Sequence, residues 1–428
     1  MNRVGLSRSL DYVFLVVFII SLLSLALYRY EFRGYFVPIH FIVFIAFVFI
    51  RSLYVLLNSE IKLHHISLFV ILSLFLTLSF ISTLFADRSN LRNLIEVTIY
   101  VLFTLLFTQA FRNLSAENLK TTIKLLMLTL AALASFGLYG YFSGRCINAQ
   151  FSFMFGDTLG SRNTDIYMLY PSFMIALLFI YFKRTRVVSY LVLLIIIAAI
   201  VFSFSRGAIL LLLCFYMLSF SVMPKTKKGL KGAFKYLTIA VVLMTPLVFY
   251  YIEYTSGYIR LWNRFAEVQS SPRLELYLES FKIMLEHPIT GVGMENYACY
   301  TNLSSVNGPF SNPHNAYTTF GAETGILGFF TIIVVISYPF IKYHRLGNEM
   351  KQMSFNETDL FLFFTGKLLS IYLILVNLFL PFHTDGGYIF WFYYSMTLVI
   401  YFVLRQQCWQ NGRRKLKHNG LAEFNLAV

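Results

Sequence analysis

Long apolar runs alternate with short polar connections along almost the whole chain. The run from Leu191 to Phe202 contains no polar residue, whereas a barrel strand would alternate polar and apolar positions. Backbone groups inside a bilayer need internal partners, so unbroken runs of about 20 residues predict helices. The pattern predicts about twelve membrane-spanning helices, near residues 12–28, 36–57, 66–86, 94–111, 122–142, 164–182, 188–204, 206–222, 236–252, 316–341, 359–380 and 389–404.

The composition points the same way. Of the 428 residues, 58% are hydrophobic and only 13% are charged, and the mean hydropathy is +0.67. A soluble domain is about half apolar and about a quarter charged, so this apolar surplus does not fit inside one water-soluble core. These values exclude a disordered chain, a disulfide-rich scaffold and a cytosolic enzyme. They predict an all-α polytopic membrane protein.

The basic residues are distributed unequally between the two sides that these helices define. The formal net charge is +15, and with a cytoplasmic N-terminus 23 of the 35 Lys and Arg fall on the inner side and 11 on the outer side. Lys367 lies within a span. This asymmetry follows the positive-inside rule and predicts that both termini are cytoplasmic. The basic side then faces anionic membrane lipids, so no nucleic acid partner is needed to explain the charge.

One connection is far longer than the others. Residues 253–315 form a segment of about 60 residues of mixed polarity, which parity places outside, and long loops in tight bundles are usually functional. We therefore divide the chain into helices 1 to 9 (1–252), this periplasmic loop region (253–315), helices 10 to 12 (316–404) and a basic cytoplasmic tail (405–428). No small-residue cleavage site follows the first span, so we expect it to remain as an anchor.

The outer loop contains a predicted amphipathic helix. Ser271 and Pro272 suit a helix start, and His287-Pro288 ends the pattern. Arg273 falls in the first turn, where unpaired backbone N–H groups and the helix dipole favour an anion such as phosphate. The structural alternative is a surface arginine paired with Glu267 or a lipid headgroup. We expect the helix to lie at the outer membrane–water boundary, because apolar residues recur at helical spacing: Leu274, Leu278, Phe281 and Leu285.

Two more ionisable residues lie at the outer ends of predicted helices. Arg206 occupies a very short break between two apolar runs, where an arginine must either snorkel to water or meet an anion. His314 directly precedes the helix that begins near Ala316, and a histidine takes up a proton near neutral pH, as a general base must. The alternative for His314 is a cap or an interface residue.

Smaller candidates lie on the same side. Arg162 to Asp165 and His383 to Gly387 each adjoin a predicted helix, so they either line an outer cavity or cap a helix end. Tyr297 and Tyr300 are able to stack on sugar rings, although aromatic residues at a bilayer interface need no ligand.

Missing motifs narrow the chemistry. The sequence has no Asp-x-Asp, no paired His at helical spacing and no Cys-x-x-Cys, so it predicts no site for Mg²⁺, Mn²⁺ or Zn²⁺. It also lacks a phosphate-binding Gly loop, which argues against ATP, and no cofactor is expected. An anionic substrate would have to be held by arginine. Cys146 and Cys299 both fall in outer loops, which permits a disulfide without implying one.

Several segments together resemble the bacterial O-antigen ligase and polymerase family, and the resemblance covers about residues 190–340. Their order and their spacing around a long outer loop carry the resemblance. The segments are Ser205-Arg206-Gly207, Arg273 at a helix start, His287 to Gly293, His314 to Tyr317, and Glu323 to Gly328.

The resemblance implies a metal-independent, inverting membrane glycosyltransferase of the bacterial inner membrane. Its active site would be periplasmic, and its donor would be a glycan linked to undecaprenyl diphosphate. The implied site comprises two arginines that bind the diphosphate and assist catalysis, Arg206 and Arg273, and one catalytic base, His314. We expect three further substrate contacts: Asn315 and Tyr317, which lie within the resemblance, and Arg162, which lies outside it on the same side of the membrane.

Three functions share these features. An O-antigen ligase transfers the glycan to lipid A-core, and a polymerase transfers it to another lipid-linked glycan; overall resemblance favours the ligase. A flippase or transporter for lipid-linked oligosaccharides also needs about twelve spans and cationic grooves. Such transporters commonly show two related halves and mid-membrane charges. Here no internal repeat is evident, the polar groups gather at one face, and only Lys367 lies in mid-span.

Overall fold

The computed structural model of the chain describes residues 31–32, 35–36, 46, 48–53, 66–86, 91–142, 166–182, 186–203, 206–222, 273–301, 313, 315–351, 355–379 and 387–418. The predicted all-α fold gains a small β-hairpin. Its two strands, β1 (Glu31–Phe32) and β2 (Tyr35–Phe36), have two residues each and are antiparallel. The described helices are α3 (Ile66–Leu84), α4 (Leu91–Phe111), α5 (Ala116–Phe142), α7 (Tyr170–Tyr181), α8 (Arg186–Phe202), α9 (Arg206–Val222), α12 (Arg273–Glu286), α13 (Tyr297–Tyr300), α14 (Ala316–Met350), α15 (Glu357–Val376) and α16 (Gly387–His418).

Five of the described helices are long and apolar enough to cross a membrane, and three shorter apolar helices accompany them. The five are α3, α4, α5, α14 and α15, and the shorter ones are α7, α8 and α9. The protein is therefore a polytopic membrane protein. The predicted spans at 12–28 and 236–252 lie outside the described residues.

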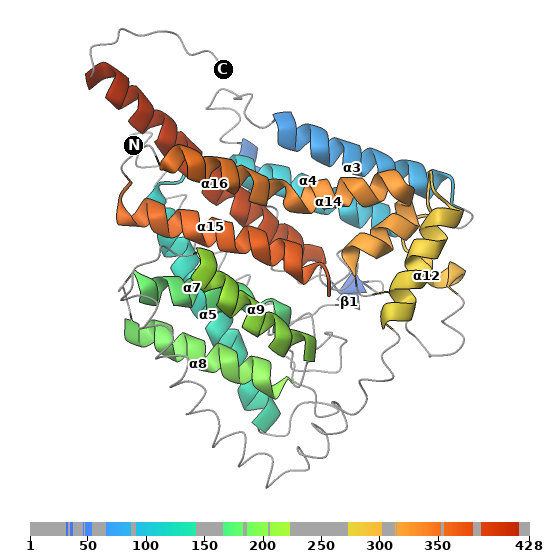
Figure 1. Cartoon of the computed structure of the whole chain (residues 1–428), viewed down its shortest axis with the longest axis horizontal. Coiled ribbons are helices and arrows are strands. Elements are labelled where there is room, and N and C mark those ends of the chain that lie inside the picture. The colour runs from blue at the N-terminus through green and yellow to red at the C-terminus, as the bar shows by residue number, and fades with distance from the viewer. Residues whose placement is uncertain are drawn as a thin grey trace.

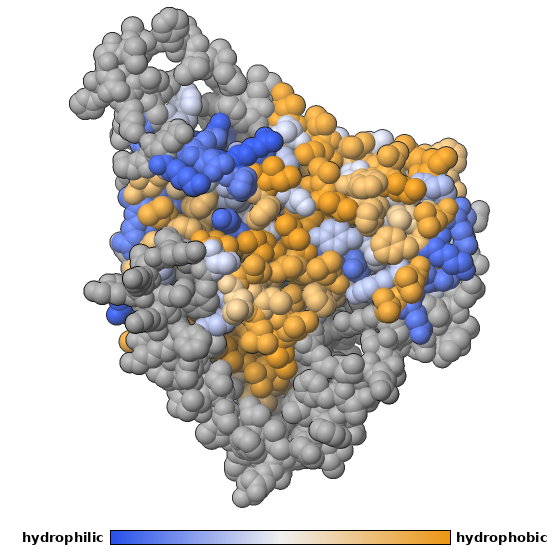
Figure 2. Space-filling view, viewed as in Figure 1, coloured by the Kyte–Doolittle hydropathy of each residue, from blue (hydrophilic) through white to orange (hydrophobic). Residues whose placement is uncertain are grey.

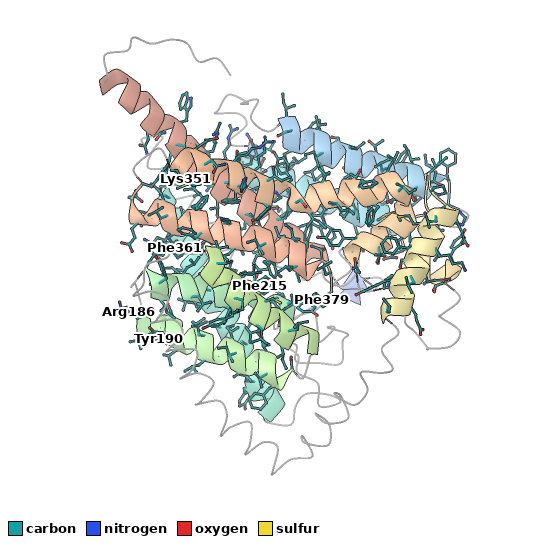
Figure 3. All side chains as sticks on the ribbon, in the orientation of Figure 1. Arg186, Tyr190, Phe215, Lys351, Phe361 and Phe379 are labelled. Carbon is teal, nitrogen blue, oxygen red and sulfur yellow. The ribbon has the colours of Figure 1, made fainter. Side chains whose placement is uncertain are left out.

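Helix α15 lies at the centre of the bundle. It packs against α14 and α16 on one side and against α5, α7 and α9 on the other. Figure 1 shows α3, α4, α14 and α15 running nearly side by side, while α12 crosses the ends of α3 and α14. In Figure 3, Phe379 lies toward the end where α12 crosses, and Arg186, Phe361 and Lys351 lie at the opposite end. We call these the Phe379 end and the Lys351 end; the charge distribution predicts that the Lys351 end is cytoplasmic.

The outer surface of the bundle is apolar. Phe69 and Val70 of α3 are 58% and 55% exposed, and Phe330 of α14 is 59% exposed. Figure 2 shows this apolar surface extending over the flank of the bundle. Water would oppose such exposure, since each square ångström of apolar surface costs about 25 cal/mol, whereas lipid tails cover it without that cost. This surface is the one that faces the bilayer.

Buried tyrosines tie neighbouring helices together through hydroxyl-to-backbone hydrogen bonds. The Tyr372 hydroxyl donates to the Tyr167 carbonyl at 2.9 Å, and the Tyr343 hydroxyl donates to the Thr397 carbonyl at 2.9 Å. The Tyr393 hydroxyl likewise donates to the Met168 carbonyl at 3.0 Å. A buried hydroxyl needs such a partner, and a backbone carbonyl oxygen has two lone pairs with which to accept.

Helices α14 and α16 extend furthest beyond their predicted ends. Helix α14 continues to Met350 and carries a break at Gly325, whose φ of 77° and ψ of −173° are not helical. Helix α16 continues beyond the predicted end at residue 404 to His418. Both helices are longer than the roughly 20 residues that a bilayer requires, so their ends at the Lys351 end reach past the hydrocarbon region.

Candidate functional site

The end of α15 is the point where α12 and α14 are attached to the bundle. The backbone N–H of Ala316 donates to the Asn377 carbonyl at 2.9 Å, and the Tyr317 hydroxyl donates to the Ile374 carbonyl at 3.0 Å. From α12, the Tyr277 hydroxyl donates to the Leu378 carbonyl at 3.4 Å. The starts of α12 and α14 are therefore held at the Phe379 end.

Asn315 is the N-cap of α14. Its side-chain oxygen accepts from the backbone N–H groups of Tyr317 and Thr318 at 3.0 and 3.2 Å, which satisfies donors that a helix start leaves unpaired. The side chain is largely buried, and Tyr317 is half-buried with its hydroxyl engaged on α15. Capping accounts for the side-chain oxygen of Asn315, so the predicted substrate contact rests on its amide nitrogen.

The start of α9 is tied to the same region through aromatic residues. The Tyr170 hydroxyl of α7 donates to the Ala208 carbonyl in the first turn of α9 at 2.5 Å. The Tyr170 ring stacks on Tyr167, and the Tyr167 ring lies 6.5 Å from Phe379. These contacts connect the start of α9 to the end of α15 and so bring a third helix start to the Phe379 end.

Two of these helices begin with an arginine. Arg206 is the first residue of α9, which has no acidic residue in its first turn, and Arg273 is the first residue of α12. A helix start carries positive partial charge, so an arginine there favours a nearby anion; the first turn of α12 contains one carboxylate, Glu275, and that of α9 contains none. Two such starts at one end of a membrane protein make a favourable location for a phosphate group.

Helix α12 presents three different faces. The first is buried against α14 and α13 and consists of Leu276, Ser280, Ile283 and Met284. The second is apolar and exposed, and consists of Leu274, Leu278, Phe281 and Leu285. The third is charged and consists of Glu275, Glu279, Lys282 and Glu286. Faces toward protein, lipid and water are what a helix lying in the membrane surface requires, and the predicted amphipathic helix is confirmed.

The segment that follows α12, His287 to Gly293, is hydrogen-bonded to the break in α14; we call it the strap. The N–H groups of Val292 and Gly293 donate to the carbonyls of Ala322 and Glu323 at 3.1 and 2.9 Å. In return, the N–H of Ile326 donates to the Pro288 carbonyl at 2.9 Å. The break at Gly325 removes the helical partners of these groups, and the strap replaces them.

Glycine makes this contact possible. Gly291 and Gly325 have positive φ values of 65° and 77°, which residues with a Cβ rarely adopt. A Cβ on Gly291 would overlap the Glu323 backbone, and one on Gly325 would lie 2.6 Å from the Pro288 carbonyl oxygen. The two glycine-containing segments that the sequence singled out, 287–293 and 323–328, thus lie in direct contact.

Glu323 is a buried acidic residue of α14 that was not predicted individually as a site residue. It is 1% exposed, and its backbone carbonyl also accepts from the Ser82 hydroxyl of α3 at 2.5 Å. Thr319 and Thr324 nearby on α14 are buried as well. An acidic side chain in an apolar span is the signal that identifies such a residue, because charge is costly there unless it has a function or a partner.

The two tyrosines after the strap differ in their surroundings. Tyr297 is 1% exposed and its hydroxyl donates to the Leu276 carbonyl at 3.1 Å, so the suggestion that it stacks on a sugar is wrong. Burial raises the pKa of Tyr297 above its ordinary value. Tyr300 is only partly buried, and its ring packs edge-on against His287 at 5.5 Å between centroids.

Several predicted site residues are described only in part. The backbones of Arg206 and Arg273 begin α9 and α12, while their side chains are outside the described residues. Arg162 and His314 lie outside the described residues altogether, as do His383 to Gly386 and Cys146. The structure thus brings together the starts of α9, α12 and α14, at or beside which Arg206, Arg273 and His314 lie in the chain. The roles of these three side chains remain predictions.

Residues 190–333 match the family model described as O-antigen ligase. The chain therefore contains an O-antigen ligase domain over this range, which includes α9, α12, the strap and the break in α14. Enzymes of this family are membrane glycosyltransferases. Comparison with curated proteins gave no match.

Proposed function

We propose that the protein is an O-antigen ligase that transfers a glycan from undecaprenyl diphosphate to a sugar hydroxyl of lipid A-core at the periplasmic face of the inner membrane. The observation that carries this proposal is the meeting of the starts of α9, α12 and α14 at the end of α15. All three starts fall within residues 190–333, the range that matches the family.

Arg206 and Arg273 would hold the donor diphosphate. Each stands at a helix start, where the backbone already favours an anion, and guanidinium groups bind phosphate oxygens in a forked manner. The exposed apolar face of α12 lies beside the polar site, which suits a donor that has a polyprenyl chain in lipid and a diphosphate at the surface. The two arginines would stabilise the negative charge that develops on the diphosphate as the glycosyl–oxygen bond breaks.

His314 would act as the general base. Its neighbour Asn315 caps α14 at the same end of the bundle. The histidine would accept the proton of the acceptor hydroxyl as the hydroxyl oxygen attacks the anomeric carbon from the face opposite the diphosphate. The new glycosidic bond forms, undecaprenyl diphosphate leaves, and the anomeric configuration inverts. The cleaved linkage supplies the driving force, so no nucleotide is required.

The decisive experiment is transfer in vitro by the purified full chain with a defined lipid-linked donor. His314→Ala is expected to lower transfer by about a hundredfold or more while donor binding is retained, and Arg206→Ala is expected to weaken donor binding. Arg186→Ala is the matched control, because Arg186 also begins a helix but lies at the Lys351 end. Full transfer by the His314 variant would refute its role as base.

The choice of acceptor separates the related functions. Product with lipid A-core as acceptor supports a ligase, and product only with a second lipid-linked glycan supports a polymerase. Movement of the donor across proteoliposomes without any new glycosidic bond would support a flippase instead.

A further inference from the structure

Basic side chains from two helices gather at the Lys351 end, far from the site described above. Lys342 and Arg345 lie one turn apart on α14, and Arg405 lies on the adjacent α16. Lys342 is close enough to Arg345 and Arg405 to be repelled by both. We call these three residues the cationic patch. Figure 2 shows a strongly hydrophilic surface over this end of α14 and α16.

Two of the three basic side chains in the patch have defined contacts. The Lys342 Nζ lies 5.1 Å from the centre of the Tyr338 ring, one turn earlier on α14. Arg405 is paired with Glu349, which follows Arg345 by one turn. Tyr338, Lys342, Arg345 and Glu349 therefore lie along one face of α14. Lys342 and Arg345 lie on this face and Arg405 lies beside it on α16, with the single carboxylate of Glu349 among them, so the named groups keep a net positive charge.

The patch lies where the apolar surface of the bundle ends. On α14, Ile341 is 44% exposed immediately before Lys342, and Val334 is 45% exposed two turns earlier. On α16, Trp409 is 46% exposed one turn after Arg405. An exposed tryptophan beside basic residues is typical of the level at which lipid headgroups meet the hydrocarbon region. The patch is thus at headgroup depth in the leaflet on the Lys351 side.

We propose that the cationic patch binds the phosphate of an anionic phospholipid in that leaflet. Lys342, Arg345 and Arg405 have only the Glu349 carboxylate as counter-charge among the named groups, and a lipid phosphate is an anion present at this depth. Basic groups between adjacent membrane helices are a known form of headgroup site. This inference is independent of glycan transfer, because the patch lies at the opposite end of the bundle from the helix starts at Phe379.

The position of Trp409 allows a direct test. The full chain is reconstituted in bilayers that contain brominated phosphatidylglycerol or brominated phosphatidylcholine at equal mole fraction, and the fluorescence of Trp409 is taken as the difference from a Trp409→Phe variant. Phosphatidylglycerol is expected to quench Trp409 more strongly. Lys342→Gln with Arg345→Gln is expected to lower this preference by about 25-fold, at about fivefold for each cation removed.

Three controls make the outcome clear. Lys351→Gln removes an exposed cation that is not on the patch and should keep the preference. Arg345→Gln alone, at an exposed position, should lower the preference by about fivefold even if the double variant folds poorly. Millimolar inorganic phosphate should not compete with the lipid. Equal quenching by the two lipids, unchanged preference in both variants, or full competition by free phosphate would each overturn the proposal.

Discussion

The contact between the strap and α14 predicts a large effect of Gly325→Ala. Gly325 has φ 77° and ψ −173°, a region that residues with a Cβ occupy at a cost of about 1–3 kcal/mol. An added Cβ would lie 2.6 Å from the Pro288 oxygen and 2.8 Å from the Ile289 oxygen, so the strap must move away. Movement breaks the bond from the Ile326 N–H to Pro288 and weakens the two bonds from the strap to α14.

The loss of local stability in the Gly325→Ala variant is the sum of the lost hydrogen bonding and the backbone strain. The broken hydrogen bond contributes about 1 kcal/mol, the two weakened bonds about 0.5 kcal/mol each, and the backbone strain about 2 kcal/mol, so we expect the strap to lose about 4 kcal/mol of local stability. Because 1.4 kcal/mol is a tenfold change in an equilibrium, the amide hydrogens of Val292, Gly293 and Ile326 should exchange about a thousandfold faster.

Hydrogen exchange of the full-length protein, followed by mass spectrometry of peptides that cover 288–296 and 320–330, measures this effect. Gly347→Ala is the matched control, since Gly347 is helical and a Cβ there meets only the tip of the Phe363 ring, at 2.9 Å. Wild-type exchange protection of the strap in the Gly325→Ala variant would show that the break in α14 does not depend on glycine.

Three other predictions concern the site and its support. Arg273→Lys should fail to restore transfer, because an ammonium group does not reproduce the forked contact of a guanidinium; turnover at the wild-type level would remove the two-point clamp from the mechanism. Transfer by the purified protein should be insensitive to chelators, and a loss of activity that Mg²⁺ restores would contradict the metal-independent mechanism. Burial raises the pKa of Tyr297, so this residue stabilises the fold fully below pH 10 and less as the pH rises beyond it, where the unfolded chain loses the proton first. In thermal unfolding between pH 9 and 11, Tyr297→Phe should therefore lose less stability than the wild type, and equal losses would argue against this assignment.

The sequence predicts the helices where their signals are local. An apolar run is sufficient for α8 and for α9, because a short serine-containing break follows the first and a basic connection follows the second. Ser271-Pro272 marks the start of α12 to within a residue. The extension of α16 to His418 is not local in origin: beyond residue 404 the helix is supported by packing, with Cys408 buried and Arg405 paired with Glu349 across to α14.

The sequence predicts which residues belong to the site better than it predicts how the helices arrange them. The order of Arg206, Arg273 and His314 along the chain indicates a common side of the membrane, and the structure brings the starts of α9, α12 and α14 to one end of the bundle. The break at Gly325 is different. A glycine within a helix commonly stays helical. Here the strap determines the conformation of Gly325, because it supplies hydrogen-bond partners from residues 30 or more positions away in the chain.

The tyrosine hydroxyls that reach backbone carbonyls of other helices also limit how the bundle responds to its surroundings. Each hydroxyl contacts one carbonyl at one depth, as Tyr372 does at Tyr167 and Tyr393 at Met168, both just before α7. A shift of α7 and this preceding turn along α15 or α16 by even a single residue would therefore break these hydrogen bonds. In a thicker or thinner bilayer these helices must therefore tilt together as one block. Replacement of such a tyrosine by phenylalanine keeps the ring and removes the hydroxyl group, and with it the hydrogen bond that fixes the two helices at one relative depth.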